Sequence, residues 1–314
     1  MQSRRAFMKS FLGAAATLAL ADKFAGASAQ KAALTTARFR ESGANAKLVI
    51  HALRNSVSMI SGTGGNVLVL PGPEGKLVVD SGFATSRVQM AKALDSLSAD
   101  PLRLLVNTHW HFDHTDGNEW IHGAGATILA QENTLSRMTH KQFIPEFEGV
   151  YPPSPPGALP TETFEQNKTL QVNGQSLRLV RYTPAHTESD IAVYFVDADV
   201  LHTGDAYFSA FYPFIDYNSG GSIDGMLAAT RETLALIGRS TIVVCGHGPA
   251  GSRDDVVTFQ EMLANVHANV AKLKQAGASA EEVVARRPTA AYDKKWGGGF
   301  ISPDLFTWLV YRGA

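Results

Sequence analysis

Hydrophobic positions in the sequence alternate between short β-rich runs and longer runs with helical spacing. Short apolar runs bounded by turn residues predict strands at 47–53, 66–70, 76–80, 102–106, 126–130, 169–172, 176–182, 191–196, 200–202 and 241–245. Helical runs are predicted at 85–98, 132–140, 223–237 and 256–275, followed by two shorter helices that close the chain. The strands fall into two sets that each end in helices, which favours a layered α/β protein with two sheets inside and helices outside.

Several segments between these elements have the composition of turns or loops. Pro-Gly-Pro-Glu-Gly at residues 71–75 predicts a hairpin between two early strands. The proline-rich residues 151–160 predict a loop that either shapes the rim of a site or forms an inert surface excursion. The glycine-rich residues 61–65 lack the Lys-Ser or Lys-Thr pair of a phosphate-binding loop, so nucleotide binding is not expected. Residues 293–296 are expected to form a solvated turn without a role.

Residues 1–29 have the organisation of an export signal. Ser-Arg-Arg-Ala-Phe-Met-Lys at residues 3–9 precedes a short apolar run at 11–21, and Ala-Ser-Ala at 27–29 suits a cleavage site. The paired arginines are similar to those of the twin-arginine signal. The apolar run is shorter than the roughly 20 residues of a membrane span. We therefore expect cleavage and export, to the periplasm or beyond, with no stable membrane span; an uncleaved anchor is the alternative.

Net charge and cysteine content limit which partners and covalent bonds are expected. The chain of 314 residues has a net charge of −1, and removal of residues 1–29, with four basic side chains and one acidic one, would leave −4. No basic patch indicates a nucleic-acid partner, so a small-molecule substrate is expected. Cys245 is the single cysteine, which excludes an intrachain disulfide. The sequence does not predict an oligomeric state.

Four side chains of metal-ligand type are concentrated in one short segment. Residues 108–114 read Thr-His-Trp-His-Phe-Asp-His, which places His109, His111, Asp113 and His114 within six residues. Three histidines and an aspartate rarely fall so close together by chance. Imidazole nitrogens and a carboxylate suit zinc, and they also suit iron or manganese. Because the predicted strand 102–106 runs directly into this segment, the cluster is expected on the loop at the carboxyl end of that strand.

This motif resembles the signature of the metallo-β-lactamase superfamily, and four further segments match that family in order. They are Val-Val-Asp-Ser-Gly at 78–82, Thr-Pro-Ala-His-Thr at 183–187, Leu-His-Thr-Gly-Asp at 201–205 and Val-Cys-Gly-His-Gly-Pro at 244–249. Agreement across five ordered motifs is much more specific than agreement with one. The resemblance spans roughly residues 47–251. It implies a four-layer αββα sandwich over residues 30–251, with C-terminal helices at 252–314 packed on the same domain.

The resemblance also implies a role for each ligand-type residue. It implies two metal ions, one bound by His109, His111 and His186 and the other by Asp113, His114 and His247, with Asp205 bridging both. The implied cofactor is a pair of zinc ions, and iron or manganese is the alternative. Asp113 would also act in catalysis, by orienting the nucleophile and carrying a proton to the leaving group.

Several residues near these motifs can be interpreted in two ways. By analogy, Asp80 orients the ligand loop rather than binding metal. His202 is either a structural histidine or a support for a ligand, and Cys245 is expected to be a buried thiol rather than a ligand. The glycine-rich residues 61–65 form either a flap over the metals, as the resemblance suggests, or a plain hairpin turn. An aromatic segment follows Asp205 and either walls an apolar pocket or packs in the core: Tyr207, Phe208, Phe211, Tyr212, Phe214 and Tyr217.

Two departures from the main group of zinc β-lactamases bear on the substrate. Those enzymes have a cysteine where this chain has Asp205, and a carboxylate-binding lysine where it has Phe208. Asp205 is similar to the residue of glyoxalase II-type thioesterases and lactonases. Residues 186–190, His-Thr-Glu-Ser-Asp, instead resemble the β-lactamase form of the third motif. Glutathione thioesters are mostly cytoplasmic, which weighs against a glyoxalase II for an exported protein.

The resulting hypothesis is an exported zinc-dependent hydrolase that uses a metal-bound hydroxide to cleave a cyclic amide or ester, β-lactam-like or lactone-like. The alternatives on the same two metals are a glyoxalase II-like thioesterase and a phosphodiesterase. An iron oxidoreductase of the same fold is a further class: the diiron flavoproteins carry glutamate at the position of His111, whereas the persulfide dioxygenases keep the histidines and use one iron. A non-catalytic binding protein would have lost ligands, and all seven are present.

Overall fold

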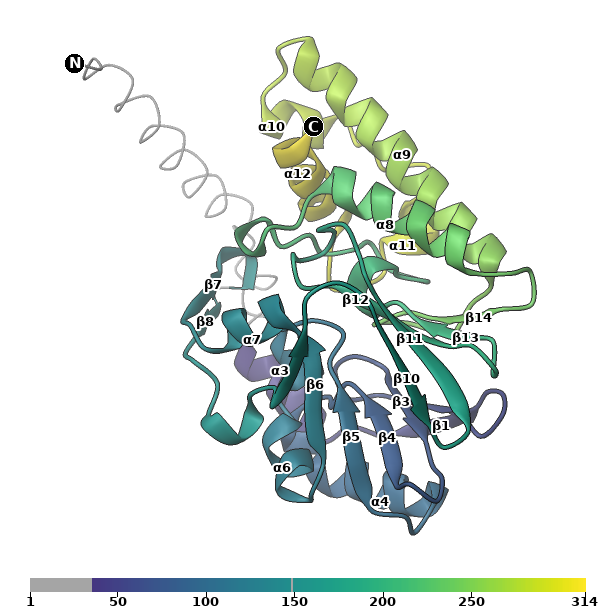
Figure 1. Cartoon of the computed structure of the whole chain (residues 1–314). Helices are drawn as coiled ribbons and strands as arrows, with labels where there is room; N and C mark the ends of the chain where they lie inside the picture. Colours follow the sequence, from purple (N-terminus) through teal and green to yellow (C-terminus); the bar gives the residue numbers. More distant parts are fainter. Residues whose placement is uncertain (1–35, 148) are drawn as a thin grey trace, which may run out of the picture.

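The computed structural model describes residues 36–147 and 149–314. The export signal predicted at residues 1–29 lies outside the described residues. Within the described part of the chain, two β-sheets lie against each other, and helices cover the outer face of each sheet (Figure 1). The predicted four-layer αββα arrangement with helices at the C-terminal end is therefore confirmed.

The first sheet contains seven strands in the spatial order β1-β2-β3-β4-β5-β6-β9. Their bounds are β1 (Val49–Ala52), β2 (Ser58–Ser61), β3 (Val67–Leu70), β4 (Lys76–Val79), β5 (Leu102–Val106), β6 (Thr127–Gln131) and β9 (Glu162–Phe164). Neighbours from β1 to β4 are antiparallel, whereas β4, β5, β6 and β9 are parallel. Every residue of β3 and β4 is buried, which explains why both read as continuous apolar runs rather than as alternating patterns.

The second sheet contains five strands in the spatial order β10-β11-β12-β13-β14. Their bounds are β10 (Lys168–Val172), β11 (Gln175–Arg181), β12 (Ile191–Phe195), β13 (Val200–His202) and β14 (Ile242–Val244). Only β13 and β14 pair in parallel. A separate two-stranded ribbon, β7 (Gln142–Ile144) with β8 (Gly149–Tyr151), lies outside both sheets and was not predicted.

Helices α4 and α6 cover the first sheet, and α8, α9 and α12 lie over the second (Figure 1). The α-helices are α3 (Thr36–Ala44), α4 (Arg87–Leu97), α5 (Phe112–Thr115), α6 (Asn118–Gly123), α7 (Glu132–Met138), α8 (Ile223–Leu236), α9 (Arg253–Gln275), α10 (Ala280–Ala285), α11 (Asp293–Trp296) and α12 (Pro303–Gly313). The 3₁₀ turns are η1 (Ala84–Ser86), η2 (Pro145–Phe147), η3 (Pro156–Ala158), η4 (Gly204–Ala206) and η5 (Tyr217–Ser219). No helix in the described part of the chain combines the length and apolar character needed to cross a bilayer.

Two expectations for the C-terminal region were wrong. Three helices follow α9 rather than two, because residues 293–296 form α11 instead of a solvated turn. The Trp296 side chain is buried in the core, and Asp293 accepts a hydrogen bond from the hydroxyl of Tyr212 across 3.0 Å. Trp296 is thus a core residue within a short charged run, and its neighbours in the sequence give no sign of its burial.

Three apolar clusters hold the layers together. One lies between the sheets and joins residues such as Leu68 and Val106 to Leu179 and Val193. The second packs α4 and α6 on the outside of the first sheet. The third is the largest: it packs α8, α9 and α12 on the outside of the second sheet and includes most of the aromatic side chains that follow Asp205.

Candidate metal centre

The seven predicted ligand residues all lie just beyond the carboxyl ends of strands. Four of the strand ends in the two sheets lead into them. His109, His111, Asp113 and His114 follow β5, His186 follows β11, Asp205 follows β13 and His247 follows β14. The strands converge at one edge of the sandwich, so side chains up to 138 positions apart in the sequence meet there. The structure therefore brings all seven residues together.

The first group consists of His109, His111 and His186, whose side chains are buried. Nδ1 of His111 and Nε2 of His186 lie 2.8 Å apart. The other ring nitrogen of each is held by the protein: Nε2 of His111 lies 3.1 Å from Oδ2 of Asp216, and Nδ1 of His186 donates to the carbonyl oxygen of Phe214 across 2.8 Å. These contacts leave one nitrogen of each ring directed at the other.

The second group consists of Asp113, His114 and His247. Nε2 of His247 lies 3.0 Å from Oδ2 of Asp113 and 3.4 Å from Nε2 of His114. Nδ1 of His114 donates to Oδ2 of Asp80 across 2.7 Å, so Asp80 orients this ring as the resemblance implied. Asp80 also accepts hydrogen bonds from the amide and the hydroxyl of Thr108, each across 2.8 Å.

Asp205 lies between the two groups. Its Oδ1 is 3.2 Å from Nε2 of His114, while its Oδ2 is 3.4 Å from Nε2 of His247 and 3.6 Å from Nε2 of His186. One carboxylate therefore reaches histidines of both groups. Gly246 makes this approach possible, because a Cβ at that position would overlap Oδ1 of Asp205.

The protonation of these residues follows from burial and from the two carboxylates. Burial lowers the pKa of His109 and of His186, so both imidazoles are neutral, as a metal ligand must be. Burial opposes ionisation of Asp205, but the nearby His247 and His114 hold its pKa well below its usual range. The pKa of His247 is raised to about 9, because the attraction of Asp205 and Asp113 exceeds the effect of burial. The same negative charge would attract a divalent cation.

The donor set fits a metal pair. Three overlapping groups have ligand atoms that all lie within 4.8 Å of one another: His109 with His111 and His186, His109 with His114 and Asp205, and Asp113 with His114 and His247. Nε2 of His109 is buried and has no hydrogen-bond partner among the described residues. A buried ring nitrogen without a partner is costly unless something else engages it. Nitrogen and carboxylate donors in these numbers suit zinc.

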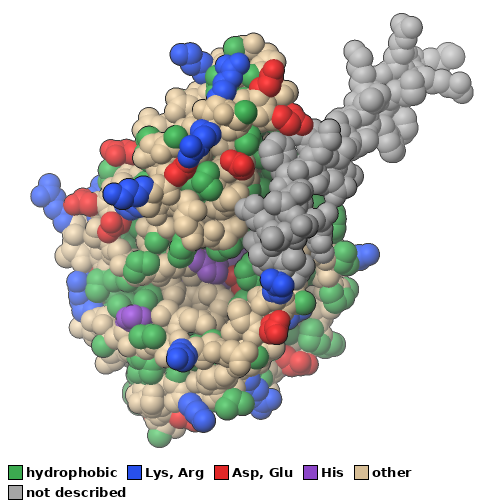
Figure 2. Space-filling model, turned by 180° about the vertical axis from the view of Figure 1, so that it is seen from behind, with side chains coloured by type: hydrophobic (Ala, Val, Ile, Leu, Met, Phe, Trp, Pro, Cys, Tyr) green, Lys and Arg blue, Asp and Glu red, His purple; other side chains and the backbone are tan. Residues whose placement is uncertain are grey.

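A cavity of about 200 Å³ opens onto these residues. His111, Asp113, His186, Asp205 and His247 line it, and most of the remaining lining is aromatic. On the surface, Figure 2 shows histidine in a hollow, beside an acidic side chain and between hydrophobic groups. The candidate site is thus open to small molecules, and its floor carries the ligand-type side chains.

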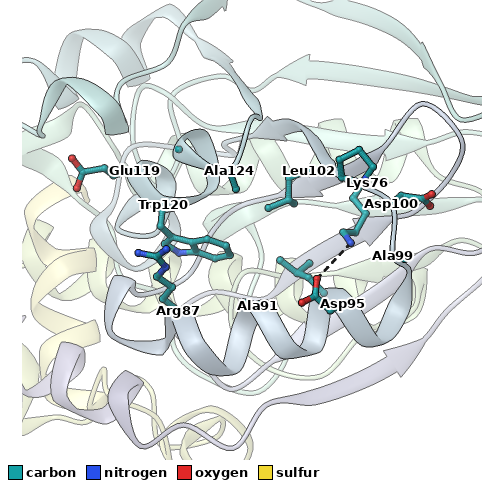
Figure 3. A pocket seen from close by; sticks show the side chains of 13 residues that line it. Lys76, Arg87, Ala91, Asp95, Ala99, Asp100, Leu102, Glu119, Trp120 and Ala124 are labelled. Carbon is teal, nitrogen blue, oxygen red and sulfur yellow. Dashed lines mark ion pairs between the residues drawn. The ribbon is translucent and has the colours of Figure 1, made fainter.

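A larger cavity of about 670 Å³ lies at the other end of the first sheet (Figure 3). Lys76 and Leu102, which line it, are the first residues of β4 and β5, so the cavity faces away from the carboxyl ends of these strands. Its two basic side chains have local partners: Nζ of Lys76 donates to the carbonyl of Ser98 across 2.6 Å, and Arg87 stacks over Trp120. No histidine or cysteine lines this cavity, so we do not assign chemistry to it.

The structure distinguishes between the alternative roles of His202, Cys245 and the glycine-rich residues 61–65. His202 is structural, because Nε2 donates to the carbonyl of Asn66 across 3.0 Å and Nδ1 accepts from the amide of Gly204. Cys245 is a buried thiol that donates to the carbonyl of His247, and burial raises its pKa to about 11. The glycine-rich residues 61–65 form the turn between β2 and β3 and pack on the ligand motif, where the amide of Gly65 donates to the carbonyl of Asp113.

In the aromatic segment after Asp205, one side chain lines the cavity and others pack in the core, so both expected roles occur. Phe214 lines the cavity, whereas Tyr207 and Tyr212 are buried in the core. Phe208 is also buried and stacks on the imidazole of His247, with ring centroids 5.7 Å apart. The proline-rich loop does not line the cavity itself, but Tyr151 at its start stacks on Phe112, which does.

Sequence reasoning missed several residues of the site. Asp216, which holds His111, lies in the aromatic segment without a motif of its own. Phe39, Phe147 and Phe300 line the cavity, although they are 108 and 153 positions apart in the sequence. Single phenylalanines in a helix, a 3₁₀ turn and a loop carry no local signal, so only the tertiary structure identifies them.

Comparisons with known proteins agree with this geometry. A family model described as the metallo-β-lactamase superfamily matches residues 60–247, more than half of the chain. The hydroxyacylglutathione hydrolase of Rhodospirillum rubrum is 29% identical over 144 residues, which are 46% of this chain and 47% of that protein. The chain therefore spans about half the length of that relative. The probable metallo-hydrolase YqgX of Bacillus subtilis is 32% identical over 163 residues, which are 51% of this chain and 74% of that protein.

Solved structures share the fold. A metallo-β-lactamase from Pontibacter korlensis has a TM-score of 0.58 and 19% identity, covering 70% of this chain and 100% of that one. The sec-alkylsulfatase Pisa1 from Pseudomonas sp. has a TM-score of 0.67 and 15% identity, covering 84% of this chain and 50% of that one. At such identities the likeness concerns the fold alone. Together, the family model and the ordered motifs show that this chain belongs to the metallo-β-lactamase superfamily.

Proposed function

We propose that the protein is an exported dizinc hydrolase that cleaves a cyclic amide or ester, β-lactam-like or lactone-like. The observation that carries this proposal is the position of Asp205, whose two oxygens reach both ligand groups at the floor of an accessible cavity. A carboxylate between two clusters of neutral or carboxylate-paired imidazoles is the arrangement that bridges a metal pair. In this proposal His109, His111 and His186 hold one zinc ion, and Asp113, His114 and His247 hold the other.

Two zinc ions, when bound, would activate water as a nucleophile and polarise the carbonyl oxygen of the substrate. The residues of the chain have separate tasks. Asp113 lines the cavity, and its pKa is lowered to about 2, because the effects of His114 and His247 exceed that of burial. Its carboxylate is therefore ionised at neutral pH, and it can hold the attacking water and accept a proton for the leaving group. Asp80 and Asp216 keep His114 and His111 in orientation.

The test combines metal analysis with a hydrolysis panel. The purified protein should contain about two zinc ions and should hydrolyse a chromogenic cephalosporin, a γ-lactone or both. Asp205→Asn should lower turnover at least about 100-fold, whereas Asp95→Asn, at an exposed position on α4, should leave it unchanged. Zinc-loaded protein that cleaves only bis-p-nitrophenyl phosphate, or no panel member, would overturn the proposal.

A thioesterase is the second candidate. The supporting observations are the aspartate at position 205 and the 29% identity to the hydroxyacylglutathione hydrolase of Rhodospirillum rubrum. S-Lactoylglutathione and a γ-lactone, assayed on the same zinc-loaded preparation, separate the two candidates. A kcat/KM for the thioester at least about tenfold above that for every lactone and lactam would favour the thioesterase.

The proposed export rests on residues 1–29 of the sequence. The N-terminus of protein recovered from the periplasm should begin at Gln30, and Arg4→Lys with Arg5→Lys should keep the precursor in the cytoplasm. Mature protein that retains residue 1 and stays with the cytoplasm would contradict this part of the proposal.

A further inference from the structure

The cavity above the proposed metal centre has an aromatic wall. Besides the ligand-type residues, its lining consists mainly of six phenylalanines: Phe39, Phe83, Phe112, Phe147, Phe214 and Phe300. They come from α3, the loop after β4, α5, the 3₁₀ turn after β7, the segment after Asp205, and the loop before α12. Ile144 completes the apolar surface.

These rings contact one another and form one continuous surface. The ring centroid of Phe39 lies 6.3 Å from that of Phe112, 6.0 Å from that of Phe147 and 6.1 Å from that of Phe300. Phe147 packs on Phe214 at 4.7 Å. Phe300 also lies 5.7 Å from the imidazole of His247, so the aromatic wall reaches the ligand groups. A group bound against this wall would be next to the reacting bond.

No lysine or arginine of the described residues lines this cavity. Two arginines that lie beside residues of the wall have partners outside the cavity. Arg40 is paired with Asp116 at 2.6 Å and lies over the ring of Phe112, and Arg312 is paired with Glu146 at 2.9 Å. Asp113 and Asp205 also line the cavity, but in the proposed function both are metal ligands, so they provide no counter-ion for an anionic group at the wall. Phe208, three residues after Asp205, is buried against His247 and offers no positive charge either.

We propose that the substrate group bound in this cavity is uncharged and apolar, with the bulk of a phenyl ring or a short alkyl chain, and that the enzyme discriminates against a carboxylate at that place. The inference rests on the proposed hydrolase function and adds the substrate class. An apolar group leaves water for an aromatic surface and gains free energy, whereas a carboxylate there would lose its hydration without gaining a counter-ion. β-Lactam carboxylates and glutathione conjugates would therefore be poor substrates compared with neutral lactones and esters.

The test uses two activated esters of equal chain length. 4-Nitrophenyl hexanoate ends in a methyl group, and mono-4-nitrophenyl adipate ends in a carboxylate. The zinc-loaded protein should hydrolyse the hexanoate with a kcat/KM at least about tenfold higher. Equal values, or a preference for the adipate, would overturn the inference while leaving the hydrolase function intact.

A binding measurement tests the inference without relying on turnover. Hexanamide and adipamate differ in the same terminal group, and ligand-observed NMR titration gives their dissociation constants. Hexanamide should bind at least about tenfold more tightly. Equal or tighter binding of adipamate would overturn the inference. Failure to hydrolyse any ester, lactone or lactam, with hexanamide still preferred, would instead contradict the proposed function.

A charge introduced into the wall should reverse the preference. Phe39→Lys and Phe300→Lys each place an ammonium group at the cavity, from two independent segments, and each should reduce the hexanoate-to-adipate ratio at least about tenfold. Phe143→Lys is the matched control, because the Phe143 side chain is 45% exposed on β7 and does not line the cavity. A ratio that changes as much in the control as in the two variants would contradict the role of the wall.

Discussion

Oδ2 of Asp80 accepts a hydrogen bond from Nδ1 of His114 across 2.7 Å, and both side chains are completely buried. The same carboxylate holds the amide and the hydroxyl of Thr108. Asp80 therefore fixes both ends of the segment 108–114, and it does so from a left-handed backbone conformation with φ of 62°. Such conformations are uncommon outside glycine and asparagine, and they cluster at functional sites.

Replacing this carboxylate should weaken zinc binding without removing a ligand. Asp80→Ala leaves Nδ1 of His114 without its acceptor, so the ring can rotate and its Nε2 is no longer held toward Asp205. We expect zinc affinity to fall about 10–100-fold, measured by competition with a chromophoric chelator. Asp95→Ala, which removes an exposed carboxylate on α4, is the control. An Asp80→Ala protein with the zinc affinity of the wild type would show that Asp80 does not support the site.

The turn between β2 and β3 should tolerate no side chain at its last glycine. A Cβ at Gly65 would overlap the imidazole of His114, whereas a Cβ at Gly123 in α6 meets no atom within 4 Å. Gly65→Ala should therefore lower both zinc content and stability, the latter by about 1–3 kcal/mol. Gly123→Ala should be neutral or slightly stabilising. Equal effects of the two substitutions in zinc analysis and thermal unfolding would contradict this packing.

The thiol of Cys245 should be dispensable for metal binding. It lies two residues before His247, but it is buried and its pKa is raised to about 11, so a thiolate does not form near neutral pH. Cys245→Ala should keep both zinc ions and turnover within about threefold, at a stability cost of about 1–2 kcal/mol. Loss of one zinc ion from this variant would identify the sulfur as a ligand.

Glu146 should make folding stability depend on pH. Burial raises its pKa to about 7 from an ordinary value of 4.5, although Arg312 lies 2.9 Å away. The folded protein thus binds this proton more tightly than the unfolded chain, and the resulting stabilisation is complete below pH 4.5 and is lost as pH rises through 7. It amounts to at most about 3 kcal/mol.

Glu146→Gln removes this contribution, so its deficit in unfolding free energy relative to wild type should be larger at pH 5 than at pH 8. Glu261→Gln, at an exposed position on α9, should show no such difference. A deficit for Glu146→Gln that is larger at pH 8 than at pH 5 would contradict the assigned shift.

The sequence predicted the central strands well because their pattern reflects burial directly. β3, β4 and β5 appear as largely apolar runs, and the segment 108–114 with four of the ligand-type residues directly follows β5. The predicted start of α9 was three residues late: the capping box of Ser252 and Asp255 begins the helix at Arg253, before the first apolar position. The short strands β2, β7, β8 and β9 were missed, because three or four residues are too few to show a period. The equally short β13 and β14 were predicted.

The ligand-type residues could be found from local motifs, but the surface that faces the substrate could not. Phe39 and Phe300 come from opposite ends of the described chain and meet at 6.1 Å. Asp216 holds His111 from a segment that reads as aromatic core. Each of these relationships depends on how α3, the β7–β8 ribbon and the loop before α12 pack around the site, which hydrophobic periodicity does not encode.

The most direct test of the account is a zinc titration of the metal-free protein, with bound zinc and hydrolysis of a neutral γ-lactone measured on the same samples. If the dizinc centre is correct, binding saturates at two zinc ions per chain and turnover reaches its maximum with the second ion. In Asp205→Asn both sites should be weakened together, because Asp205 contacts both groups. Saturation at one ion, or full turnover of the zinc-free protein, would contradict the dizinc centre.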